Sequence, residues 1–135
     1  MADASDYLET QILNWIKGTT FPTAPASVYV GLFSSDPTDT GSAGTEVTTT
    51  IRAAGRVAAT FGANSGTGDG ATSITNDALV DFGNADAGAS VTHYGVFDAV
   101  SAGNMLVSNS LTTSKTVETG DPVSFAIGAI TLSVD

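Results

Sequence analysis

The sequence predicts an all-β fold: an antiparallel, jelly-roll-like β-sandwich of about eight strands, preceded by one short N-terminal α-helix. Beyond residue 18, apolar residues recur at every second position in short segments, which is the period of a strand. Clusters of Gly, Asp, Asn, Ser and Pro separate these segments, as turns separate the strands of a sandwich. Because no second helical segment is available to cross between parallel strands, we expect the strands to pair antiparallel.

The helix is predicted over residues 7–17, with Asp6 as N-cap and Glu9 as its partner in a capping box. Gly18 is predicted to end it in the left-handed conformation. Four apolar residues fall on one stripe of this helix: Leu8, Ile12, Trp15 and Ile16. A helix of about three turns is marginal alone in water, so its stripe must be buried against the sandwich or against another protein.

Residues 19–25 follow as a stiff extended connector, because Pro22 and Pro25 restrict the backbone and exclude a helix. We therefore divide the chain into a helix and connector, residues 1–25, and a β-sandwich domain, residues 26–135. The connector gives the helix room to reach away from the sandwich. This favours an anchor on another protein over a lid on the sheet.

Residues 28–33 have apolar side chains on both faces, so this strand is predicted to be central in its sheet. Further strands are expected at about residues 46–51, 56–61, 73–76, 78–82, 90–98, 105–111, 115–117, 123–127 and 130–134. Dense turn sequences lie at residues 34–41 and 62–71.

The charge balance excludes two classes of partner. With 4 Lys and Arg against 14 Asp and Glu, the net charge of −10 repels nucleic acid and anionic lipid. No apolar run approaches the ~20 residues that span a bilayer. The first residues also lack the basic and apolar regions of a signal peptide. We expect a soluble protein that is made in a cytoplasm and has neither a nucleic-acid nor a membrane partner.

The sequence contains few residues that could act in catalysis or bind a metal. There is no Cys, and His93 is the one histidine, without a Gly-x-Ser-x-Gly segment to supply a nucleophile. We interpret His93 as a hydrogen-bonded strand residue and expect neither catalysis nor a cofactor. Carboxylates gather in turns as the pairs Asp36 with Asp39 and Asp81 with Asp86, and Asp69 lies between glycines. Such residues usually bond their own backbone; a calcium site in one acidic loop is the alternative.

Arg52 and Arg56 are the two arginines of this acidic chain. Each is expected to serve either a carboxylate or an interface contact. Trp15, on the helical stripe, is expected to be a core or docking anchor. The residues predicted to contact other proteins are Leu8, Ile12, Trp15, Ile16, Arg52 and Arg56.

Several segments, in order, resemble a group of small bacteriophage virion proteins described as tail-fibre-like or structural. The matching segments are VYVGLFSSDPTDTG (28–41), GTEV (44–47), GRVAATF (55–61), DF (81–82), VTHYGVFDA (91–99), GNML (103–106) and LTTSK (111–115). One departure is Ala54-Gly55, where relatives often have an aromatic residue before the strand arginine. The resemblance implies a virion location and no catalytic residues.

The size of the chain indicates where in the phage particle it could lie. A fibre spans long distances, whereas a sandwich with a radius of gyration of about 14 Å suits a lattice. We therefore favour a capsid cement or decoration protein that bridges major capsid subunits, with a tail fibre, tail or baseplate adaptor as the alternative. The expected partners are the major capsid protein or other virion proteins. A homo-oligomer is also expected, because edge strands and an apolar helix stripe favour pairing. A carbohydrate-binding module is disfavoured, since the aromatic residues fall inside strands or on the helix.

Overall fold

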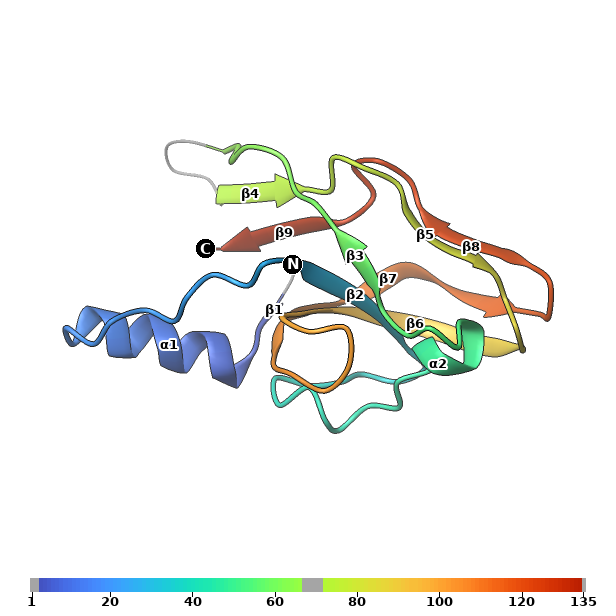
Figure 1. Cartoon of the computed structure of the whole chain (residues 1–135), viewed down its shortest axis with the longest axis horizontal. Coiled ribbons are helices and arrows are strands. Elements are labelled where there is room, and N and C mark those ends of the chain that lie inside the picture. Colours follow the sequence, from blue (N-terminus) through green and yellow to red (C-terminus); the bar gives the residue numbers. More distant parts are fainter. Residues whose placement is uncertain (1–2, 67–71, 135) are drawn as a thin grey trace.

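The computed structural model describes residues 3–66 and 72–134 (Figure 1). In these residues the elements are β1 (Asp3–Ala4), α1 (Asp6–Ile16), β2 (Val28–Phe33), α2 (Thr48–Ile51), β3 (Val57–Ala59), β4 (Thr72–Thr75), β5 (Val80–Asn84), β6 (Ala89–Phe97), β7 (Met105–Val117), β8 (Pro122–Phe125) and β9 (Thr131–Val134). The fold is all-β and sandwich-like with a short N-terminal helix, as the sequence predicts.

One layer is a five-stranded antiparallel sheet in the order β1-β7-β6-β2-β3. The second layer consists of two antiparallel pairs, β4 with β9 and β5 with β8 (Figure 1). Buried side chains of β2 and β6 meet those of β5 and Ile130 in one apolar core. Each large side chain removed from water there contributes about 1.5–3 kcal/mol.

Strand β2 lies between β6 and β3, which confirms its predicted central position. On its core face Val30 and Leu32 are buried. On its opposite face Phe33 stacks against Phe97 at 6.1 Å between ring centroids, and Met105 completes a second, smaller apolar cluster. Both faces of the main sheet are therefore covered at β2, which explains its continuous apolar sequence.

The strand predicted over residues 46–51 is wrong. Glu46 makes a single bridge to Phe33, and the chain then turns into the short helix α2. Its Thr48 is buried, and the Thr48 hydroxyl accepts a hydrogen bond from the Leu32 amide at 2.8 Å. The Thr48 side chain, rather than the backbone of a neighbouring strand, is the hydrogen-bond partner of the Leu32 amide, so the run of β-branched residues does not continue as a strand.

The two strands predicted over residues 105–111 and 115–117 are one strand, β7. Both of its ends pair with β6, but the register shifts between Val91, opposite Lys115, and His93, opposite Ser110. The intervening residues 111–114 form an irregularity of β7 rather than a turn. Strand β1 was not predicted, because two residues are too few to show an alternating pattern.

The helix begins one residue earlier than predicted. Ser5, not Asp6, is the N-cap, and its hydroxyl accepts from the Leu8 amide at 3.2 Å. At the other end Gly18 has a φ of +91°, as predicted for the left-handed residue. The Gly18 amide donates to Trp15 and the Thr19 amide to Asn14, which is the Schellman arrangement.

The division at residue 25 stays a prediction. Residues 3–4 pair with β7, and the Ser5 side chain is 1% exposed. Residues 18–27, which include the predicted connector, are exposed throughout and lead from α1 into β2.

Candidate functional site

Helix α1 is fixed to the sandwich by its first residues. The Ser5 amide donates to the Leu106 carbonyl at 2.9 Å, and the Ser5 hydroxyl donates to the Met105 carbonyl. The Asp6 amide donates to the Asp39 carbonyl at 3.0 Å. These bonds set the direction of the helix, whose later turns extend away from the sheet (Figure 1).

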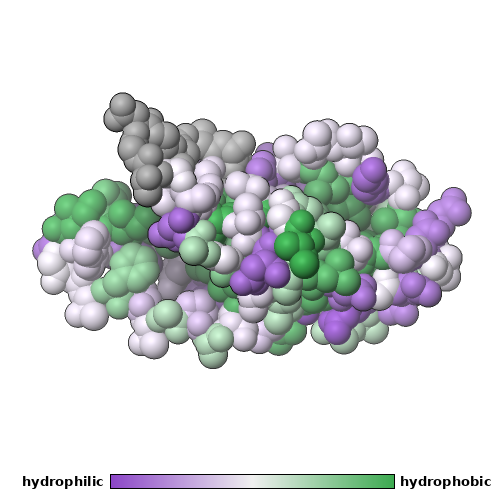
Figure 2. Space-filling model, turned by 90° about the horizontal axis from the view of Figure 1, so that it is seen from above, coloured by the Kyte–Doolittle hydropathy of each residue, from purple (hydrophilic) through white to green (hydrophobic). Residues whose placement is uncertain are grey.

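The apolar stripe of α1 divides into a covered and an exposed part. Leu8 packs against the core and Ile12 is half-buried. By contrast, Leu13, Trp15 and Ile16 are 62%, 61% and 68% exposed; we call these three residues the α1 tip. Figure 2 shows apolar side chains gathered at the end of the molecule where α1 lies. None of the eleven residues of α1 is buried, so a large apolar surface remains in water.

Leu13 was missed in the sequence analysis, which placed the stripe on the other four apolar residues. Leu13 lies next to Ile12 in the sequence, at the side of the stripe. The signal that could have found it is the width of the apolar face toward the end of the helix, where Ile12, Leu13, Trp15 and Ile16 lie within five positions.

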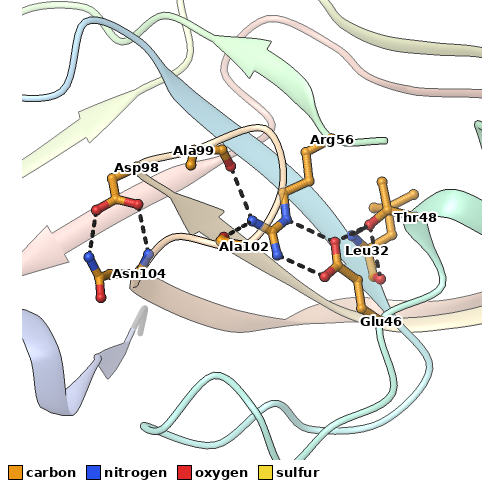
Figure 3. Close-up of polar contacts among 8 residues, drawn as sticks. All are labelled: Leu32, Glu46, Thr48, Arg56, Asp98, Ala99, Ala102 and Asn104. Carbon is orange, nitrogen blue, oxygen red and sulfur yellow. Dashed lines mark hydrogen bonds and ion pairs between the residues drawn. The ribbon is translucent and has the colours of Figure 1, made fainter. Parts of the chain in front are cut away.

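Arg56 lies inside the molecule, at 8% exposure (Figure 3). Its Nε donates to Glu46 Oε1 at 2.9 Å and its Nη2 to Glu46 Oε2 at 2.8 Å, a bidentate ion pair. Its Nη1 donates to the carbonyls of Ala99 at 3.1 Å and Ala102 at 2.7 Å. The guanidinium carbon lies 3.4 Å from the centroid of the Phe97 ring. This arginine was expected either to pair with a carboxylate or to make an interface contact, and the structure shows the pairing with a carboxylate.

The network continues from Glu46 into the core. Glu46 Oε1 also accepts from the Thr48 hydroxyl at 2.8 Å. Burial raises the pKa of Glu46, but hydrogen bonds from Arg56 and Thr48 and the charge of Arg56 outweigh it and hold that pKa below its ordinary value of 4.5. A Cβ on Gly31 would come within 2.9 Å of Glu46 Oε1, so the close approach needs glycine at this position. These contacts connect β2, the start of β3 and the loop after β6.

Arg52 supports the turn between α2 and β3. Its Nη1 donates to the Gly55 carbonyl at 2.9 Å and lies 3.5 Å from the Arg56 carbonyl. It is half-buried, and its expected role at an interface stays a prediction.

Two of the acidic turn residues bond the backbone of their own turn, as the sequence analysis favoured: Asp36 accepts from the Thr38 amide and Asp81 from the Gly83 amide, each at 2.8 Å. Asp86 instead accepts from the amide of Ala53, which is distant in the sequence, at 3.0 Å. Asp69 lies outside the described residues. Within residues 3–66 and 72–134, no group of three potential metal ligands comes together.

His93 is a partly buried residue of β6, and its Nδ1 lies 2.8 Å from the Thr92 hydroxyl. This is the hydrogen-bonded strand position that was expected. In the part of the chain that the structure describes, no helix has the length and apolarity needed to cross a bilayer.

A groove of about 730 Å³ opens between β7 and β8. Its apolar lining residues include Leu32, Val91, Tyr94, Leu111, Val123 and Phe125. Tyr94 and Phe125 meet edge to face at 5.6 Å. Burial raises the pKa of the Tyr94 phenol, while its hydrogen bond with Asn109 acts in the opposite direction. Lys115 and Asp121 also line the groove. Periodicity could not have predicted this groove, because it depends on the spacing of two consecutive strands that belong to different sheets.

The chain matches a known protein family. The model of a family described as "Podophage GP4 fiber I protein gp80" matches residues 3–133, nearly the whole chain. The chain belongs to this family. The match confirms the predicted resemblance to phage virion structural proteins, and the Gp80 family member described here is a phage structural protein. No curated protein matches the chain.

The family match covers the elements described above from β1 through all but the last residue of β9, so the α1 tip and the groove both lie within the Gp80 region. The description of the Gp80 family names a fibre and does not name a capsid cement protein. The family match alone therefore does not give the location of this protein within the virion.

Proposed function

We propose that this protein is a non-enzymatic structural subunit of the phage fibre, attached to neighbouring protein by the tip of α1. The carrying observation is the α1 tip, whose three large apolar side chains are each more than 60% exposed on a helix fixed at its first turn. A soluble helix of three turns does not require large exposed apolar residues, and exposing them lowers the solubility of the protein. A protein contact that covers them recovers the free energy of apolar burial, about 25 cal/mol per Å².

Two further observations support a fibre. The family description names a fibre protein. The molecule is also longer in one direction, with α1 extending along that axis beyond the sheet (Figure 1). A shape of this kind adds length when copies or partners join end to end, which answers the objection that one small sandwich cannot span a fibre.

Capsid cement is the second candidate, and the small size of the chain favours it. A unit of 135 residues is of the size that bridges neighbouring subunits of a shell, and repetition over the lattice would multiply a modest affinity. Its partner would be the major capsid protein. The acidic surface, with a net charge of −10, fits neither candidate better than the other.

Purified virions test the proposal. Immunogold labelling with antibodies to this chain should mark the fibres, and quantitative mass spectrometry should give far fewer copies than of the major capsid protein. Label over the head, with a copy number comparable to that of the major capsid protein, would instead establish the cement role. Absence of the chain from purified virions would contradict both.

A further inference from the structure

The β7–β8 groove runs along two strand edges that belong to different layers of the sandwich (Figure 1). Neighbouring side chains of a strand point to opposite faces, so a surface that lies against one face touches every second residue. The groove is instead lined by consecutive residues, 109–113 of β7 and 121–125 at β8. Of the residues that the structure describes, none from β5, the partner of β8, lines it. The groove therefore follows the edge of β7 and the edge of β8 that points away from β5.

These two edges have few backbone partners in the part of the chain that the structure describes. Strand β8 pairs with β5 alone, and β7, which has 13 residues, pairs on its outer edge at Val107 and Ser108, with β1. Next to them, the Ser110 amide donates to the side chain of its own neighbour, Asn109, at 2.9 Å. Such an edge presents backbone N–H and C=O groups with which another strand can pair.

Strand β1 shows what the edge of β7 accepts. Its pairing with Val107 and Ser108 is antiparallel, and the Ser5 amide continues it by donating to the Leu106 carbonyl at 2.9 Å. Farther along β7, residues 111–117 have no described strand partner other than β6. Three of these seven residues are threonine, which favours strands. The edge can therefore receive a second strand in line with β1.

The lining of the groove indicates which side chains such a strand would carry. The core residues Val91 and Tyr94 and the half-buried Phe125 line it, so every second side chain of an added strand would meet apolar surface. Apolar side chains at those positions gain free energy by burial. Lys115 and Asp121 line the groove together, so its own charges select neither sign. The net charge of −10 disfavours an acidic segment.

We propose that the β7–β8 groove binds an extended, uncharged segment of a partner protein, which pairs with the outer edge of β7 as an added β-strand. The segment would have about six residues, the usual length of a strand, with apolar side chains at alternate positions. Backbone pairing supplies affinity in this mode of recognition, and the pockets for alternate side chains supply specificity. The groove is separate from the α1 tip, so this inference goes beyond the proposed function and adds a second point of attachment.

Selected peptides provide the probe for a test on the full-length protein. Random dodecapeptides from a ribosome-display library would be selected on the immobilised wild type, and synthetic copies titrated by calorimetry against Thr113→Trp and Ser114→Trp. Both residues are exposed and adjacent on β7, but Thr113 lines the groove and Ser114 does not. We expect Thr113→Trp to weaken binding at least roughly tenfold and Ser114→Trp to leave it unchanged. Equal effects of the two variants, or a selection that yields no binder, would overturn the proposal.

Methylation of the peptide backbone nitrogens shows whether the peptide adds a strand. The N–H groups of alternate residues in a strand point to opposite edges, so one alternate set donates to β7. Methylating that set should abolish binding, and methylating the other set should leave most of it. Equal tolerance of both sets would show that side chains alone hold the peptide, and strand addition would be wrong.

Amide hydrogen exchange followed by NMR gives a second measurement. At saturating peptide, exchange should slow for amides of β7 within residues 111–117 and stay unchanged in β3, at the opposite edge of the sheet. Unchanged exchange in β7 would contradict the proposal. Ile16→Glu, in the α1 tip, should bind the peptide as the wild type does. The proposed function is judged by the location of the chain in virions, so the two proposals can fail separately.

Discussion

Arg56 and the α1 tip use their side chains in opposite ways. Arg56 directs four hydrogen bonds and a ring contact to groups of its own chain. Trp15 and Ile16, which are apolar, are left more than 60% exposed. The charged residue is thus inside and the apolar residues are outside, the reverse of the usual distribution.

The difference separates two kinds of requirement. The Arg56 network joins three loops and strands that are distant in sequence, so its role is to hold the fold. The side chains of the α1 tip are mostly exposed in the described residues, and we propose that their role lies in assembly. Substitutions in the two regions should therefore affect different measurements.

The largest effect on stability is expected for Arg56→Leu. This change leaves Glu46 half-buried without its partner and removes the donors to the carbonyls of Ala99 and Ala102. We expect a loss of about 3 kcal/mol in the free energy of unfolding, measured by urea denaturation. Arg52→Leu, which removes one bond to the Gly55 carbonyl, serves as the matched control and should cost about 1 kcal/mol. Equal losses would show that the buried network has no special role.

Asn76→Ala should have the next largest effect. Asn76 is 1% exposed, donates to the carbonyls of Ala78 and Ala126, and accepts from the Ile130 amide at 2.8 Å. Removing its amide leaves these buried backbone groups without partners, and we expect a loss of about 2 kcal/mol in unfolding free energy. A loss below roughly 0.5 kcal/mol would mean that water replaces the amide.

A smaller effect is expected from pH at Glu46. Its pKa in the folded protein lies below the ordinary value of 4.5, so its stabilising contribution is present above that value and is lost as pH falls through the folded pKa. The wild type should thus lose more stability than Glu46→Gln between pH 5 and about pH 3. Urea titrations at several pH values measure this difference. Parallel curves for the two proteins would show that the pair with Arg56 does not favour the charged carboxylate.

The smallest effect on stability is expected at the α1 tip. Ile16→Glu changes an exposed side chain, so the free energy of unfolding should change by less than about 0.5 kcal/mol. A larger loss would show that the tip contributes to the fold and would remove the contrast with Arg56.

Much of the sheet could be predicted because its residues show their environment locally. The apolar faces of β2 identified a central strand, and Gly18 marked the end of α1. The run at residues 46–51 misled because β-branched residues favour strands, while the buried Thr48 hydroxyl and the Glu46 pair with Arg56 favour a turn at this position. The partner of Arg56 lies ten residues away, and no periodic pattern shows such a contact.

The candidate site was predicted in part. The helical stripe indicated an anchor, but its division into a covered Leu8 and an exposed tip depends on the direction that Ser5 gives the helix. The groove could not be predicted, since it depends on the separation of β7 and β8. The sequence contains the residues of both the α1 tip and the groove, but the fold determines which of these side chains are exposed to solvent.

Incorporation into virions tests the central claim most directly. Phage would be assembled with wild-type protein, with Ile16→Glu, or with Ile127→Glu, and the copies of this chain per particle would be counted by quantitative mass spectrometry. If the α1 tip serves assembly, Ile16→Glu should be depleted from particles although it folds as stably as the wild type, and Ile127→Glu should be retained. Full incorporation of Ile16→Glu, or equal depletion of both variants, would contradict the claim.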